Sequence, residues 1–283
     1  ELPLVVVNIQ RGGPSTGLPT KTEAADLTMA MYGRHGESPM PIVAARTPSD
    51  CFDTAIEAAR IALTYNTPVL LLSDGYLANG SEPWMVPNMD DIDAIDVEFA
   101  SGLDENGEYL PYKRNEETLA RPWAIPGTPG LEHRIGGLEK ADVTGHVSYD
   151  PENHHRMVEL RQEKVNRVSQ FIPPTEVYGS EHGAMLVVSW GGTFGSCRSA
   201  VETMQDEGMN VSHVHLRWIN PLPKDLGEIL IRFKNILVPE INMGQLVKLI
   251  RAEYLMDAQG LNLVRGRPIG ASTIIETVKQ TLG

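Results

Sequence analysis

The residues best placed to do chemistry lie in a polar loop that follows the first apolar segment of the chain. The loop reads QRGGPSTG, and its Arg11 offers a planar fork of donors that suits a carboxylate or a phosphate. Gly12 and Gly13 let a ligand approach the backbone, and Ser15 and Thr16 add hydroxyl donors. The GxxxxGK[ST] spacing of a phosphate-binding P-loop is absent. These residues predict an anion site, unless Arg11 only forms an ion pair that stabilises the loop.

The elements around this loop predict a parallel α/β sheet. Apolar runs at 4–9, 41–45 and 67–74 are predicted strands, and residues 20–34 and 49–66 are predicted helices. Continuous apolar strands that alternate with helices are typical of a parallel sheet, so the first strand is expected to be buried on both faces. Ligands of such sheets bind at the carboxyl ends of the strands, where the polar loop lies.

The helix predicted over 49–66 has the clearest helical pattern. Ser49 or Asp50 can cap its amino end, and Asn66 is expected to end it. Apolar residues spaced by three or four positions predict its buried stripe, which consists of Phe52, Ile56, Ala59 and Leu63.

Beyond residue 78 the pattern changes and then returns. Residues 78–180 contain many prolines and acidic runs, with one helix predicted over 150–171. From about residue 181 strands and helices alternate again, and the run VSHVHLRWI (211–219) is predicted as one strand. Three parts are therefore expected: an α/β domain over 1–100, an extended linker with one helix over 101–180, and a second α/β domain over 181–283.

Two further polar residues are site candidates. His35 follows the first predicted helix and either contacts a cofactor or lies at a solvated helix end. Asp74 ends the strand at 67–74, where it either serves a site or only stabilises a turn. The run SWGGTFGS (189–196) lacks the GxGxxG spacing of a dinucleotide site, so it predicts tight helix–sheet packing or a helix amino end facing a neighbour.

Composition excludes several classes of function. The formal net charge of −13 argues against nucleic acid as a partner, because phosphate binding needs a basic face. Two distant cysteines, Cys51 and Cys197, form no CxxC pair, and the adjacent His154 and His155 cannot share a helix face, so no metal site is predicted. The two distant cysteines imply no disulfide framework, so a reducing cytoplasm is expected. No membrane helix or signal peptide is visible. Glu1 stands at the start of a core strand, which suggests that upstream residues are missing.

Several long motifs carry a resemblance to a known family. They are NIQRGGPSTGLPTKTEAADL, YGRHGE, LLLSDGYLANGSEPW, PGLEHRIGGLE, LRWINPLP and VPEINMGQL. Together they resemble the alpha subunits of the 2-oxoacid:ferredoxin oxidoreductases, most closely the 2-oxoglutarate type, over almost the whole chain. The resemblance implies a thiamine-pyrimidine-type domain followed by a transketolase C-terminal-like domain. The family's upstream YPITP motif and activating glutamate are not in these residues, so the chain is expected to be the C-terminal portion of the subunit.

The resemblance also implies an activity. It implies oxidative decarboxylation of a 2-oxoacid with coenzyme A and ferredoxin, with Arg11 holding the substrate carboxylate beside thiamine diphosphate. A beta subunit would hold the diphosphate, Mg²⁺ and a [4Fe-4S] cluster in an (αβ)₂ assembly. A 2-oxoacid enzyme of broader specificity, a transketolase-like enzyme and a non-catalytic scaffold remain alternatives. The implied site residues are Arg11, Gly12, Gly13, Ser15 and Thr16 for the substrate, and His35 and Asp74 for the cofactor.

Overall fold

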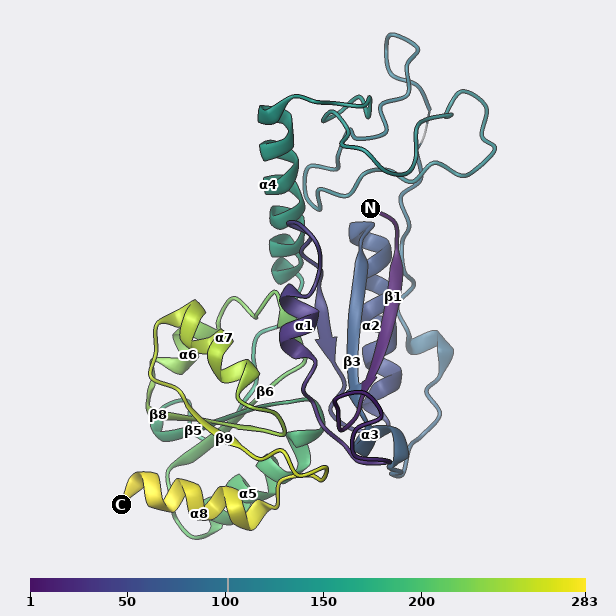
Figure 1. The fold of residues 1–283 in the computed structure, drawn as a ribbon. Coiled ribbons are helices and arrows are strands. Elements are labelled where there is room, and N and C mark those ends of the chain that lie inside the picture. Colours follow the sequence, from purple (N-terminus) through teal and green to yellow (C-terminus); the bar gives the residue numbers. More distant parts are fainter. Residues whose placement is uncertain (101) are drawn as a thin grey trace.

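The computed structural model describes residues 1–100 and 102–283, which contain two sheets, each with its own helices (Figure 1). The first sheet has the strand order β1-β3-β2-β7, and its first three strands run parallel. A mixed α/β architecture with parallel strands was predicted and is confirmed. The elements of the first part are β1 (Leu4–Gln10), α1 (Leu27–Tyr32), β2 (Ile42–Ala44), α2 (Asp50–Tyr65) and β3 (Pro68–Asp74).

The two central strands of the first sheet are buried on both faces. Val43 of β2 and Val69 of β3 pack on one face in a cluster that includes residues of α2. Ile42 and Leu72 lie in the larger cluster that joins α1 to the second sheet. Successive strand residues point to opposite faces, so each of these strands contributes side chains to both cores.

The strand β1 does not meet the expectation of burial on both faces. It pairs only with β3 and therefore forms the edge of the sheet. Leu4 and Val7 are each 55% exposed and Ile9 is 54% exposed. An apolar run predicts a strand, but the number of neighbours that the strand acquires decides how much of it is buried.

The helix predicted over 20–34 is present only as α1, Leu27–Tyr32. The residues before it form no helix and are bonded to the second half of the chain. The Thr22 amide donates to the carbonyl of Gly266 (3.3 Å), and the Ala24 amide donates to the carbonyl of Ile241 (3.3 Å). These long-range bonds replace the local ones that a longer helix would need.

The helix α2 matches its predicted bounds, but its most buried face is not the predicted stripe. Its buried apolar residues are Ala58, Ile61, Ala62 and Tyr65. The four residues of the predicted stripe are all only partly buried. Phe52, one of them, packs instead against Trp84 of the following segment, with 5.5 Å between ring centroids.

The connecting region has little regular structure. Its elements are α3 (Gly75–Asn79), the 3₁₀ turn η1 (Met89–Asp91), α4 (Pro151–Arg167) and the 3₁₀ turn η2 (Val168–Gln170). Between η1 and α4, the described residues form only isolated bridges, such as Phe99 with Trp123. The helix predicted over 150–171 corresponds to α4 and η2. Asp150 caps α4 by accepting from the Glu152 amide (3.1 Å).

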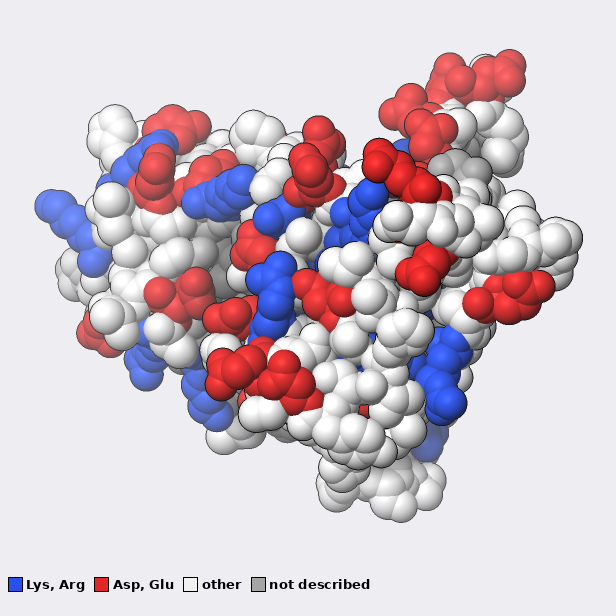
Figure 2. Space-filling view, turned by 90° about the horizontal axis from the view of Figure 1, so that it is seen from above, with Lys and Arg blue, Asp and Glu red and all other residues white. Residues whose placement is uncertain are grey.

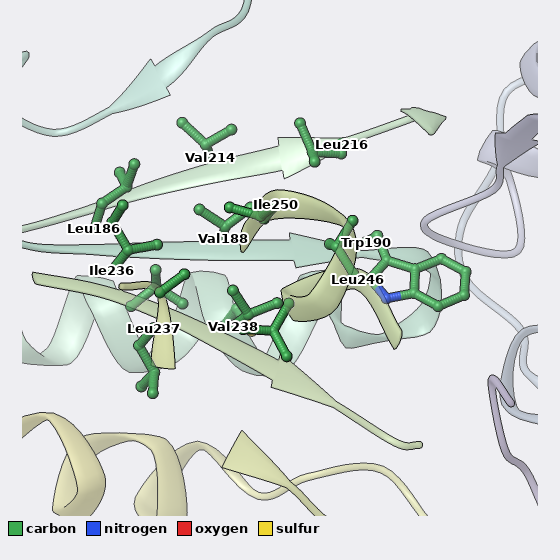
Figure 3. Close-up of a cluster of buried hydrophobic side chains, with 14 of the residues drawn as sticks. Leu186, Val188, Trp190, Val214, Leu216, Ile236, Leu237, Val238, Leu246 and Ile250 are labelled. Atoms are coloured by element: carbon green, nitrogen blue, oxygen red, sulfur yellow. The ribbon is translucent and has the colours of Figure 1, made fainter. Parts of the chain in front are cut away.

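The second sheet has the order β4-β6-β5-β8-β9. Figure 1 shows α6 and α7 over one face of it and α5 and α8 over the other. Its core is drawn in Figure 3, where side chains of β5, β6, β8 and α7 interlock. The elements are β4 (Val177–Tyr178), β5 (Gly183–Trp190), η3 (Gly191–Thr193), α5 (Phe194–Asp206), β6 (Val211–Leu216), α6 (Leu226–Leu230), β8 (Phe233–Glu240), α7 (Gln245–Tyr254), β9 (Gln259–Asn262) and α8 (Ala271–Leu282).

The run predicted as one strand over 211–219 is divided between the two sheets. Residues Val211–Leu216 form β6 of the second sheet, and Trp218–Asn220 form β7, which pairs antiparallel with β2 of the first. The amide of Ala44 donates to the carbonyl of Arg217 between them (2.8 Å). The second α/β part therefore contributes a strand to the first sheet, so a boundary at residue 181 does not separate the two units completely.

The surface carries both signs of charge. Figure 2 shows acidic and basic side chains intermixed on the face seen from above. The formal net charge of the chain is −13. No helix in the described part of the chain has the length and apolar character needed to cross a bilayer.

Candidate functional site

The predicted site lies at the carboxyl ends of β1 and β3 in the first sheet. Gln10, the last residue of β1, is buried, and both polar atoms of its side-chain amide form hydrogen bonds here. Its Nε2 donates to the carbonyl of Ser73 in β3 (3.1 Å), and its Oε1 accepts from the amide of Asp26 (2.9 Å). Sequence analysis did not select Gln10, although a buried polar residue at the end of an apolar strand was the available signal.

The polar loop after Gln10 is closed by its own backbone. The Gly12 amide donates to the carbonyl of Lys21 (2.9 Å), and the Gly12 carbonyl accepts from the Leu18 amide (3.0 Å). The Gly13 amide donates to Glu23 Oε2 (3.2 Å). Gly17 has φ of +56°, and a Cβ there would lie 1.8 Å from the Gly12 carbonyl oxygen. The amides of both predicted site glycines are thus used inside the loop rather than left free for a ligand.

The side chains predicted to bind the anion are presented outward from this closed loop. Arg11, Ser15 and Thr16 are all exposed. Within residues 1–100 and 102–283, the guanidinium of Arg11 makes no hydrogen bond or ion pair. The alternative that Arg11 stabilises the loop through an ion pair therefore has no support in the described contacts. Its donors remain free to bind an anion that approaches this edge.

Side chains from the second half of the chain hold the segment that follows the loop. Asn242 Nδ2 donates to the carbonyl of Ala24 (2.7 Å), and Gln245 Nε2 donates to the carbonyl of Ala25 (2.6 Å). Both side chains belong to the run VPEINMGQL, which was part of the family resemblance. The motif thus holds the backbone that follows the Arg11 loop.

A buried carboxylate organises that motif. Glu240 Oε1 accepts from Trp190 Nε1 (3.2 Å), Asn242 Nδ2 (3.0 Å) and the Leu246 amide (2.8 Å), and Oε2 accepts from the Val247 amide (3.1 Å). The carboxylate satisfies the first amides of α7, which otherwise have no partner in a helix. Burial raises the pKa of Glu240 above its ordinary value, and the four donors act against that rise.

Asp74 joins the two sheets. Its Oδ1 accepts from Thr22 Oγ1 (2.8 Å) and from the amides of Tyr76 (2.8 Å) and Leu77 (3.3 Å), so it also caps α3. Its Oδ2 accepts from the Gly192 amide of η3 (3.2 Å). Both oxygens are therefore engaged within the chain, which favours the structural alternative, while a cofactor contact by Asp74 stays a prediction. The bond to Gly192 also fits the interpretation of SWGGTFGS as a turn that faces a neighbouring element.

The structure separates His35 from the other predicted site residues. His35 is exposed and lies in the connection from α1 to β2. That connection enters β2 at its amino end, whereas Arg11 and Asp74 follow the carboxyl ends of parallel strands. The connection that carries His35 and the loop that carries Arg11 thus lie at opposite ends of the parallel strands. Figure 1 shows the connection from α1 to β2 and the loop after β1 at these two ends. If His35 contacts a cofactor, that contact lies at the other end of the strands from the Arg11 loop.

Comparison with known families agrees with the resemblance found in the sequence. Residues 1–150 match the family described as "Pyruvate flavodoxin/ferredoxin oxidoreductase, thiamine diP-bdg". Residues 184–274 match the family described as "Pyruvate:ferredoxin oxidoreductase core domain II".

Individual relatives cover the whole chain. It is 50% identical over 284 residues to 2-oxoglutarate oxidoreductase subunit KorA of Mycobacterium tuberculosis, which is all of this chain and 43% of the relative. It is 31% identical to the alpha subunit of 2-oxoacid:ferredoxin oxidoreductase 1 of Aeropyrum pernix, over 98% of this chain and 44% of the relative. The chain therefore spans less than half the length of these two relatives.

Solved structures give the same result. A 2-oxoglutarate:ferredoxin oxidoreductase from Magnetococcus marinus, with 2-oxoglutarate, coenzyme A and succinyl-CoA bound, superposes with a TM-score of 0.92 at 35% identity. The match covers 99% of this chain and 49% of that one. A split-gene transketolase matches with a TM-score of 0.50 at 11% identity, over 98% of this chain and 66% of that one, and shows a common fold only. The chain belongs to the thiamine diphosphate-binding family of pyruvate flavodoxin/ferredoxin oxidoreductases.

Proposed function

We propose that the chain forms the substrate-binding part of the alpha subunit of a thiamine diphosphate-dependent 2-oxoglutarate:ferredoxin oxidoreductase. In this reaction 2-oxoglutarate, coenzyme A and oxidised ferredoxin give succinyl-CoA, carbon dioxide and reduced ferredoxin. The observation that carries the proposal is the 50% identity, over the whole chain, to a 2-oxoglutarate oxidoreductase subunit. The superposition on a solved enzyme that holds 2-oxoglutarate supports the same substrate.

Arg11 would bind the substrate carboxylate next to the 2-oxo group. Backbone hydrogen bonds close the loop, and Asn242 of the run VPEINMGQL holds the segment that follows it. The backbone that carries the Arg11 side chain is therefore held in place. Its donors are free, and a guanidinium can give a carboxylate two parallel hydrogen bonds. The role of Arg11 would be to bind and orient the substrate rather than to transfer a proton.

The donors that the loop leaves free belong to its side chains rather than to its backbone. Arg11, Ser15 and Thr16 are exposed, whereas the amides of Gly12 and Gly13 already have partners. Bound thiamine diphosphate supplies the electron sink for decarboxylation. Arg11 would hold the carboxylate beside it, and the hydroxyls of Ser15 and Thr16 would bind neighbouring oxygens of the substrate.

We further propose that a beta subunit supplies the remaining groups. A [4Fe-4S] cluster needs four thiolates, and this chain has only Cys51 and Cys197. Within the described residues, no group of three His, Cys, Asp or Glu side chains is placed to hold a metal ion. As the family resemblance implies, the beta subunit would carry the cluster, the diphosphate and its Mg²⁺, and pass electrons to ferredoxin from a cytoplasmic (αβ)₂ assembly.

Substitution of Arg11 in the assembled enzyme tests the proposal. Removing one partner of a desolvated ion pair costs about 2–5 kcal/mol, so Arg11→Ala is expected to lower kcat/KM for 2-oxoglutarate by about thirty-fold or more. Arg11→Lys should restore only part of the loss, because lysine lacks the planar fork. The measurement is viologen reduction at sub-saturating 2-oxoglutarate, together with thiamine diphosphate binding, which should survive both changes.

A matched control is Arg232→Ala, which removes a partly exposed arginine that pairs with Glu181. Its kcat/KM should stay near that of the unchanged enzyme. Full activity of Arg11→Ala would show that the loop is structural and that the chain does not bind the substrate through it.

A second candidate is an enzyme with broader 2-oxoacid specificity. It is supported by two Aeropyrum pernix relatives, 31% and 30% identical, which are named 2-oxoacid:ferredoxin oxidoreductase subunits. Comparing kcat/KM for 2-oxoglutarate, pyruvate and a branched-chain 2-oxoacid separates the candidates. A preference for 2-oxoglutarate is expected, and equal rates would favour the broader enzyme.

A further inference from the structure

The Arg11 loop takes its position from the segment that follows it. The hydrogen bonds that close the loop all reach residues 18–23, where the partners are Leu18, Lys21 and the side chain of Glu23. Gln10 anchors the start of the loop in β1, so these bonds fix its other end. The contacts that hold residues 18–23 in place therefore also place the backbone that carries Arg11.

Thr22 holds this segment by two hydrogen bonds, one to each half of the chain. It is buried, and its hydroxyl donates to Asp74 Oδ1 at the end of β3 (2.8 Å). Its amide donates to the carbonyl of Gly266, in the connection between β9 and α8 (3.3 Å). A threonine side chain is stiff at χ1, so a bonded hydroxyl also restricts the backbone that carries it. Thr22 thus joins the end of the loop to the first sheet and to the second α/β part.

Asp74 is held in place without any contribution from Thr22. Its carboxylate is buried and accepts from three backbone amides, which belong to Tyr76, Leu77 and Gly192. Removing only the Thr22 hydroxyl therefore leaves Asp74 with three donors. The segment of residues 18–23, in contrast, loses the bond between Thr22 and the first sheet.

The second α/β part also packs directly on this segment. Gly266 has φ of +68°, and a Cβ there would lie 2.4 Å from Leu18 Cδ2 and 2.8 Å from Lys21 Cβ. Only glycine allows so close an approach in this backbone conformation. Leu18 and Lys21 both bond to Gly12. The contact with Gly266 thus reaches the Arg11 loop through a single further residue.

We propose that Thr22 and Asp74 are positioning residues, which hold the Arg11 loop where its guanidinium meets the substrate carboxylate. Both side chains are buried, and both act on Arg11 through residues 18–23. The inference rests on the proposed function, because it requires that Arg11 binds that carboxylate. A displacement of about 1 Å in a group that orients a substrate can cost about a hundredfold in rate, so a loose loop should be visible in the kinetics.

The test is Thr22→Val in the assembled enzyme, because valine keeps the β-branched shape and lacks the hydroxyl. We expect kcat/KM for 2-oxoglutarate to fall about tenfold, measured by viologen reduction, while thiamine diphosphate binding stays unchanged. Thr22→Ser keeps the hydroxyl and should restore most of the loss. Thr22→Ala removes the hydroxyl without placing a methyl group against Asp74, and it replaces the valine variant if that variant does not fold.

The matched control is Thr175→Val, which makes the same chemical change elsewhere. The Thr175 hydroxyl donates to Asp225 Oδ1 (2.6 Å) next to β4, at the opposite edge of the second sheet from β9. This bond does not reach residues 18–23, so kcat/KM of the control should equal that of the unchanged enzyme. Urea denaturation of both valine variants shows how much stability each has lost.

A double substitution shows whether Thr22 acts through Arg11. If it does, Thr22→Val should lower kcat/KM by no more than about twofold in a protein that already carries Arg11→Ala. If Thr22 only stabilises the fold near another group, the full tenfold loss should appear in that protein as well. The cycle therefore separates a positioning role from a general loss of structure.

Three outcomes would overturn the proposal. The first is an unchanged kcat/KM in Thr22→Val or Thr22→Ala when Arg11→Ala is impaired. The second is a loss in Thr22→Ser as large as that in Thr22→Val, and the third is the full tenfold loss in the presence of Arg11→Ala. Failure of the proposed function looks different, because Arg11→Ala itself would then be fully active, and the inference about Thr22 would fall with it.

Discussion

The strands β5 and β1 show how differently two similar apolar runs end up in one chain. β5 lies at the centre of the second sheet between β6 and β8, and Leu186 within it is fully buried. β1 lies at the edge of the first sheet beside β3 alone, and Leu4 within it is 55% exposed. The composition of a run therefore predicts that it forms a strand, whereas the number of its neighbours sets its burial.

The two sheets also differ in the length and polarity of their edge strands. The edges of the second sheet are β4, with two residues, and β9, with four residues that include polar side chains. Short or polar edges prevent further pairing. The first sheet instead ends in the seven-residue, mostly apolar strand β1, which has an open row of backbone donors and acceptors. In the described chain the second sheet thus has edges that resist further pairing, whereas the first sheet has one edge that is available for pairing.

The largest expected effect compares matched leucines in these two strands. Leu186→Ala should lower the free energy of unfolding by about 2–5 kcal/mol, because it leaves a cavity in a packed core. Leu4→Ala should lower it by less than about 1 kcal/mol, because water already reaches that side chain. Urea denaturation followed by circular dichroism gives both values. Equal losses would mean that β1 is covered in solution and would break the comparison.

A smaller effect is expected where the two sheets meet. A Cβ at Gly192 would lie 2.4 Å from Asp74 Oδ2, so Gly192→Ala should destabilise the protein by about 1–3 kcal/mol through overpacking. Gly195→Ala, in the first turn of α5, is the matched control, because a Cβ there meets no atom within 4 Å. The control should be unchanged or gain up to about 1 kcal/mol. If both alanine variants unfold at the same urea concentration, the contact between Gly192 and Asp74 does not join the sheets.

The most gradual effect is a pH dependence that comes from the interior of the second sheet. Burial lowers the pKa of His213 to about 3. As the pH falls below about 6.5, this histidine therefore binds a proton in the unfolded chain but not in the folded chain. The contribution of His213 to stability is therefore complete above about pH 6.5 and is lost as the pH falls toward 3. The loss should be about 1.4 kcal/mol for each pH unit in that range.

Replacing the buried histidine should flatten this dependence. His213→Gln is expected to reduce the slope of unfolding free energy against pH between about pH 6 and pH 4, measured by urea denaturation at each pH. His35→Gln, at an exposed position of the first part, should leave the slope as it is. An unchanged slope in His213→Gln would show that His213 is protonated in the folded protein.

Local sequence determined most of the elements and the place of the candidate site. Periodic apolar residues predicted α2, and short apolar runs predicted β1, β2 and β3. The polar loop with Arg11 was predicted to follow the carboxyl end of a strand, and it does. Such features depend on backbone preferences and on residues within a few positions of each other, so they can be read from the chain itself.

Tertiary structure decided the features that depend on distant partners. α1 is short because Ala24 bonds to Ile241, more than two hundred positions away, and the run at 211–219 is split because its end pairs with β2. The hydrogen-bonded amides of the Arg11 loop and the bond from the Gly192 amide to Asp74 likewise depend on packing. A sequence pattern shows which groups need a partner, but only the folded chain brings a particular partner within bonding distance. For that physical reason the exposure of β1 could not be predicted from the sequence.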